Sequence, residues 1–187
     1  CLMKCLSRDR SGAVAARLQR GVPRVVPDRS PARYEPFGLT EIQQAYWLGR
    51  QGSFTLGNVA SHWYREVDVV DLDCERLEAA LNWLIERHDM LRARVTPDGQ
   101  QVVAAEAPRY CIVRHDLREA SDEEQAAHML AMRERLSHEV IDVETCSSFG
   151  FEVTLLPTHS VLHTSFDLMF IDAGSAALLF SELTRYY

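Results

Sequence analysis

The spacing of hydrophobic residues along the chain changes several times between the period of a helix and that of a strand. The clearest helical pattern begins at Asp71 or Asp73, and its apolar residues recur every three or four positions. They are Leu77, Leu81, Leu84 and Ile85. Three more helices are predicted, the second of them opened by a serine and a glutamate with the spacing of a capping box. They cover residues 40–49, 121–138 and 173–187.

Segments rich in β-branched and aromatic residues lie between these helices and predict strands. They cover residues 62–70, 91–95, 101–105, 110–115, 149–156 and 160–166. Pro97, Asp98 and Gly99 predict a tight hairpin turn between the second and third of these strands. Strands that alternate with helices, together with a hairpin, favour an α/β or α+β layer architecture with a mixed sheet.

Length and charge narrow this picture. A chain of 187 residues is typical of one domain, and no apolar run reaches the ~18 residues that a membrane-spanning helix needs. The net charge of −7 is uneven, because residues 1–34 carry +6 and the rest carries −13. An acidic body repels phosphate backbones, which argues against nucleic-acid binding. We interpret residues 1–34 as a basic interdomain linker or docking segment, with an organelle-targeting peptide as the alternative.

The cysteines and histidines do not form a metal-binding pattern. Five cysteines are scattered without a CxxC pair, as expected of reduced thiols in a cytoplasmic protein. His159 and His163 share a strand face, but zinc needs a third ligand that the sequence does not offer, so core or edge histidines are expected. No glycine-rich phosphate loop is present. We therefore expect no metal and no directly bound cofactor.

Two carboxylates interrupt an apolar segment near the end of the chain. Asp167 and Asp172 lie five positions apart, so they converge only if a strand ends near Asp167 and a loop carries Asp172 to the start of the last helix. Asp172 then has a structural alternative as the N-cap of that helix. For Asp167 the alternative is a strand-end carboxylate held by an arginine or by water.

Four segments together resemble the heterocyclization (Cy) domains of nonribosomal peptide synthetases, which belong to the condensation-domain superfamily. Residues 37–50 read FGLTEIQQAYWLGR and resemble the opening motif of that family. Residues 54–66 read FTLGNVASHWYRE, similar to its next block, and residues 87–94 read RHDMLRAR, similar to the RHxxLR segment of condensation domains. Residues 167–172 match DxxxxD, which stands where ordinary condensation domains carry HHxxxDG. We refer to these four segments as the motif blocks.

The resemblance implies a fold, a reaction and partners. Residues 35–187 would be the N-terminal subdomain of such a domain, whose C-terminal half is absent, so that this chain alone is inactive. The implied fold is α/β, a chloramphenicol-acetyltransferase-like half domain built as an α+β two-layer sandwich with a mixed sheet and flanking helices. The whole domain would condense a carrier-bound acyl or aryl thioester with a carrier-bound Cys, Ser or Thr. Cyclodehydration would then give a thiazoline or oxazoline, as in siderophores and other secondary metabolites. The partners would be upstream and downstream carrier domains whose phosphopantetheine arms hold the substrates.

Within this family, Asp167 and Asp172 are the candidate catalytic residues. Asp167 is expected to face the substrate channel, and Asp172 to form a buried structural ion pair with Arg92. Two other functions stay open. One is an ordinary condensation or acyltransferase domain that forms amides or esters without cyclization, although Leu168 stands where such domains keep a histidine. The other is a noncatalytic module that only docks carrier proteins.

Overall fold

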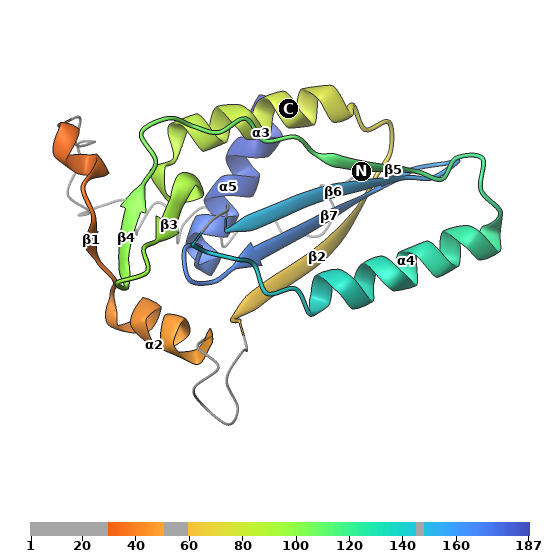
Figure 1. Ribbon diagram of the computed structural model, residues 1–187. Coiled ribbons are helices and arrows are strands. Elements are labelled where there is room, and N and C mark those ends of the chain that lie inside the picture. Colours follow the sequence, from red (N-terminus) through yellow and green to blue (C-terminus); the bar gives the residue numbers. More distant parts are fainter. Residues whose placement is uncertain (1–29, 51–59, 145–147) are drawn as a thin grey trace, which may run out of the picture. The chain divides into compact units, whose positions relative to one another are not determined.

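A four-stranded mixed sheet forms the centre of the region from Tyr34 to Tyr187 in the computed structural model (Figure 1). Its strands follow the order β2-β7-β6-β5. Their bounds are His62–Val69 for β2, Ser160–Asp167 for β7, Phe149–Leu155 for β6 and Val113–Asp116 for β5. β7 is antiparallel to both β2 and β6, and β5 runs parallel to β6. The mixed sheet that the sequence predicts is therefore confirmed.

The structure describes residues 30–50, 60–144 and 148–187. The chain divides into two units, Cys1–Arg33 and Tyr34–Tyr187, and the second contains nearly all of the described residues. Most of the proposed linker, three of the cysteines and the first part of the second motif block lie outside the described residues. The short 3-10 helix η1 (Pro31–Tyr34) is the first described element.

Helices cover the two faces of the sheet unequally. One face packs against α3 (Cys74–Arg87) and α5 (Ala173–Tyr186) through an apolar cluster that includes Phe151 and Phe166, both fully buried. On the opposite face lies α4 (Asp122–Ser137), whose capping box is present as predicted (Figure 1). Because side chains alternate between the faces of a strand, β7 presents Leu162 and Phe166 to α3 and α5, and His163, Ser165 and Asp167 to the opposite face.

A second, smaller sheet packs beside the first. It has the order β1-β4-β3, with bounds Phe37–Gly38, Gln100–Val103 and Ala93–Val95. The predicted turn joins β3 and β4, and Gly99 adopts a φ of 77° that favours glycine. The remaining elements are α2 (Glu41–Arg50), which follows β1, and the 3-10 helix η2 (Asp89–Arg92) between α3 and β3.

Two strands begin later than predicted, for identifiable reasons. The backbone N–H groups of Tyr110 and Ile112 donate to the side chains of Asn82 and Glu78 on α3, so β5 starts only at Val113. Similarly, the residues before Ala93 belong to η2 and not to β3. None of the helices in the described part of the chain is both long and apolar enough to cross a bilayer.

Candidate functional site

Asp167 ends β7 and forms a buried ion pair with Arg50, the last residue of α2. The Asp167 carboxylate is completely inaccessible to solvent, and its Oδ1 accepts the N–H of Met169 at 2.9 Å. The Arg50 guanidinium also donates to the carbonyl of Ile141 at 2.9 Å, and burial lowers its pKa. The expectation that Asp167 faces an open channel is therefore wrong, because its side chain joins α2 to the sheet.

Asp172 caps the last helix, as the structural alternative predicts. Its Oδ1 accepts the backbone N–H of Ser175 at 2.7 Å, and this bond holds the pKa of the carboxyl below its ordinary value. The residue is exposed to solvent. The predicted chain geometry is confirmed: the strand ends at Asp167, and a short loop delivers Asp172 to the start of α5.

The expected ion pair between Asp172 and Arg92 is wrong. Arg92 is buried and pairs instead with Asp89, three positions earlier. Its guanidinium also donates to the carbonyl oxygens of Ile85, Glu86 and Ala104 at 2.8–2.9 Å. Two of these carbonyls belong to the last turn of α3, where an arginine satisfies acceptors that lack a helical partner. Arg92 therefore closes the C-terminal end of α3.

A groove of about 770 Å³ runs beside the Asp172 loop, between α2 and α5. We call it the α2–α5 groove. Its walls are mostly apolar or aromatic and include Ile42, Tyr46, Trp63, Ala176 and Phe180, and its polar side chains are His62, Arg65 and Asp172. A smaller groove of about 350 Å³ shares Ile42, Leu168, Ile171 and Asp172 with it.

All four motif blocks contribute residues to these two grooves. Ile42 comes from the first block, His62 from the second, Met90 from the third and Asp172 from the fourth. Segments that are distant in sequence thus meet at one place. A mostly apolar groove with a few convergent polar groups is the usual form of a small-molecule binding site.

Polar contacts hold α2 in place, because this helix has no fully buried residue. Gln43 donates to the carbonyl of Met169 at 3.0 Å and contacts the buried side chain of Gln101 at 3.2 Å. The Arg50–Asp167 pair ties the other end of the helix to β7. The first motif block is therefore connected to the fourth through both ends of α2.

His62 is a groove residue that the sequence interpretation missed. It begins β2 directly opposite Asp167, and its Nε2 lies 2.6 Å from the hydroxyl of Ser165. That hydroxyl donates to Glu139 at 3.0 Å. Burial lowers the pKa of His62, while the negative charge of Glu139 opposes this effect. The available signal was the alternation of His62, Tyr64 and Glu66, which places three polar side chains on one face of a strand.

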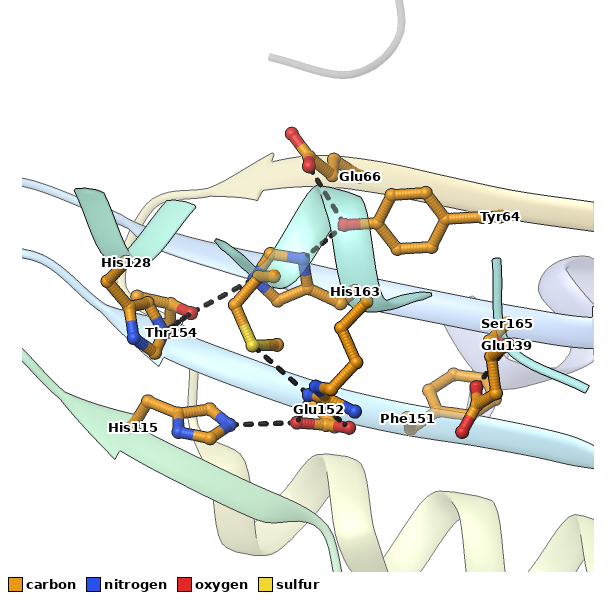
Figure 2. Close-up of polar contacts among 12 residues, drawn as sticks. Tyr64, Glu66, His115, His128, Glu139, Phe151, Glu152, Thr154, His163 and Ser165 are labelled. Carbon is orange, nitrogen blue, oxygen red and sulfur yellow. Dashed lines mark hydrogen bonds and ion pairs between the residues drawn. The ribbon is translucent and has the colours of Figure 1, made fainter. Parts of the chain in front are cut away.

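Polar side chains continue along the sheet beneath α4 (Figure 2). The buried ring of His163 lies between Tyr64, whose hydroxyl is 2.8 Å from Nδ1, and Thr154, whose hydroxyl is 3.0 Å from Nε2. Burial lowers the pKa of His163 to about 4 and raises that of Tyr64. His163 is therefore a core histidine, as predicted. Among the described residues, no group of three or more His, Cys, Asp or Glu has the arrangement of a metal site.

The known proteins that resemble this chain include synthases and synthetases, although no protein-family model matches the chain. Over 156 residues, 82% of the chain, it is 41% identical to the phenyloxazoline synthase MbtB of Mycolicibacterium paratuberculosis, of which it covers 13%. It is 38% identical to the pyochelin synthetase PchE of Pseudomonas aeruginosa, where the match takes in 83% of the chain and 11% of PchE. The chain thus spans a small part of the curated relatives that it matches.

Solved structures agree with this similarity. The cyclization-docking bidomain of the nonribosomal peptide synthetase EpoB from Sorangium cellulosum matches 94% of the chain with a TM-score of 0.80 and 34% identity, and the chain covers 35% of that structure. The nonribosomal peptide synthetase FmoA3 matches 88% of the chain with a TM-score of 0.69 and 32% identity, and the chain covers 16% of it. The fold is therefore shared along most of this chain.

Proposed function

The chain belongs to the heterocyclization and condensation domains of nonribosomal peptide synthetases, and we propose that it supplies the N-terminal half of a heterocyclization domain. The fold is the chloramphenicol-acetyltransferase-like half expected from the sequence. The relatives of known function make an oxazoline-containing product and pyochelin, as their names state. Their similarity favours ring-forming chemistry over simple amide formation.

The proposed reaction has two stages. In the first, the amine of a carrier-bound Cys, Ser or Thr attacks an acyl or aryl thioester on the upstream carrier, which forms an amide and releases the upstream phosphopantetheine thiol. In the second, the side-chain thiol or hydroxyl adds to the amide carbonyl carbon, and the carbonyl oxygen leaves as water. The product is a thiazoline or oxazoline that stays on the downstream carrier.

The observation that carries this proposal is the convergence of all four motif blocks on the two grooves beside Asp172. A groove that holds two tethered thioesters side by side turns a bimolecular encounter into an effectively intramolecular one. A second wall, from a C-terminal half of the same domain, would close the open side of the groove. The carrier domains would present their phosphopantetheine arms to it. The two cysteines among the described residues, Cys74 and Cys111, are free thiols, which fits a cytoplasmic location.

The two aspartates receive different roles in this proposal. Asp172 is exposed at the rim shared by both grooves, so its carboxylate is placed to contact bound substrate. Asp167 is buried against Arg50 and acts as a positioning residue that fixes α2 and the loop that follows β7.

Product analysis in the synthetase that contains this chain tests the proposal and separates it from its alternatives. The carriers are loaded with an aryl thioester and with cysteine, serine or threonine, and the intact carrier-bound products are weighed by mass spectrometry. Heterocyclization predicts a product lighter by one water than the open-chain amide. Accumulation of the open-chain amide alone would indicate an ordinary condensation domain, and absence of any condensed product would indicate a docking module.

A further inference from the structure

We propose that His62 is a proton-transfer residue of the α2–α5 groove, and that Ser165 and Glu139 select which of its ring nitrogens is basic. The inference rests on the proposed function for the reaction that His62 serves. His62 lines the groove together with Asp172, and β2 places it directly opposite Asp167 in the sheet.

The hydrogen bonds around Ser165 determine the tautomer of His62. The hydroxyl of Ser165 has one proton, and it donates that proton to the Glu139 carboxylate at 3.0 Å. An ionised carboxylate only accepts, so the Ser165 oxygen must in turn accept a proton from His62 Nε2, 2.6 Å away. The Nε2–H tautomer leaves the lone pair on Nδ1. Glu139 therefore acts on His62 through Ser165, as a carboxylate orients a catalytic histidine.

The contrast with His163 argues against a purely structural role for His62. Both rings lie on the α4 face of the sheet, but His163 is fully buried and has partners at both nitrogens, Tyr64 and Thr154 (Figure 2). Among the described residues, His62 has a hydrogen-bond partner only at Nε2. A core histidine saturates both nitrogens, whereas a proton-transfer residue keeps one for the substrate.

The charges around His62 suit a base at neutral pH. Burial and the positive charge of Arg50 lower its pKa from 6.5, and the negative charge of Glu139 limits that decrease. Asp167, on the neighbouring strand, forms an ion pair with Arg50. The imidazole is therefore neutral at pH 7 and has a lone pair to accept a proton.

In the condensation step, Nδ1 of His62 takes a proton from the attacking amine as the new C–N bond forms. The C–S bond of the upstream thioester breaks, and the departing thiolate of phosphopantetheine receives a proton from the imidazolium. His62 is then neutral again, and the step releases one amide and one thiol without any further reactant. General acid–base catalysis of this kind contributes roughly 10²–10⁴-fold to a rate.

The test measures single-turnover condensation against pH in the synthetase that contains this chain. Wild type should show an acidic limb where His62 becomes protonated, below pH 6.5. His62→Gln keeps an N–H donor for Ser165 but has no titrating base, so the rate should fall by roughly 100-fold or more and the limb should disappear. His138→Gln, at an exposed histidine after α4, is the matched control and should behave as wild type.

Nitrogen-15 NMR of the 187-residue chain gives an independent readout of the tautomer, and thermal melting of His62→Gln checks that the fold survives. The proposal expects the Nε2–H form in wild type. An active wild type whose rate and acidic limb are unchanged in His62→Gln would overturn the inference, and so would an Nδ1–H tautomer. A wild type that forms no condensed product would instead overturn the proposed function, and the catalytic role of His62 with it.

Discussion

Asp167 and Asp172 lie five residues apart, yet their surroundings are opposite. The first is fully buried and forms an ion pair with Arg50, whereas the second is exposed and bonded to the backbone of α5. Removal of Asp167 therefore leaves a buried guanidinium without its partner, while removal of Asp172 leaves an exposed helix end without its cap. Loss of activity would look alike in both cases, but the effects on stability differ.

Asp167→Asn should destabilise the fold by about 3–5 kcal/mol, because the buried Arg50 guanidinium loses its ion-pair partner. Urea unfolding of the 187-residue chain measures this change. The double variant Arg50→Met/Asp167→Leu removes both charges and should recover most of the lost stability. A wild-type free energy of unfolding in Asp167→Asn would show that the Arg50–Asp167 ion pair does not stabilise the fold. A double variant that loses the sum of the stabilities lost in the two single variants would show the same.

Asp172→Ala should lower the melting temperature by about 2–4 °C through loss of the N-cap. Asn caps helices as well as Asp does, so Asp172→Asn should melt close to wild type. In the complete synthetase, both variants should impair product formation if the carboxylate contacts substrate. Full activity in Asp172→Asn would show that Asp172 serves only as the N-cap of α5.

At the scale of the elements, the sequence predicted which segments form helices and strands better than it predicted how they pair. The caps of α4 and α5 were predictable because a cap depends on a few adjacent residues. The Arg50–Asp167 contact was not, because it depends on how α2 docks against a distant strand. The expected Arg92–Asp172 pair is wrong for the same reason. Arg92 instead contacts Asp89 and the carbonyl oxygens at the end of the preceding helix, α3.

The polar face of the sheet beneath α4 is also held together by contacts between elements. Two ion pairs, Arg133 with Glu66 and Arg135 with Glu152, connect α4 to β2 and β6 around the buried His163. Burial of the His163 ring on this face favours the neutral imidazole over the charged one. The stability of this face should therefore respond to acid.

His163 has a pKa of about 4 in the folded chain and an ordinary value of 6.5 when unfolded. The unfolded state thus binds the extra proton first, and stability should fall as the pH decreases from 6.5 to 4, by about 3 kcal/mol from this residue. His62 and His128, whose pKa values are also lowered, add to the same trend. Urea unfolding at several pH values measures the slope.

His163→Gln provides the control for this pH dependence. The variant is less stable at every pH if its amide fits the site poorly, but its stability should vary less between pH 6.5 and 4 than that of wild type. Equal slopes in the two proteins would contradict a neutral, buried His163.

At the scale of the whole molecule, residues of all four motif blocks gather at grooves that are open on one side. The chain covers 35% of the EpoB bidomain structure and much smaller fractions of the synthetases that it matches. We propose that the chain forms one wall of a reaction site whose other wall comes from a C-terminal half. The basic segment of residues 1–34 would connect this wall to an upstream domain.

The most direct test of the half-domain proposal compares the 187-residue chain alone with the same chain joined to a C-terminal half of a heterocyclization domain. Both are given carrier-bound aryl thioester and carrier-bound cysteine, serine or threonine, and the carriers are weighed by mass spectrometry. We expect no condensed product from the chain alone and a cyclized product, lighter by one water than the open-chain amide, from the joined protein. Turnover by the chain alone would contradict it.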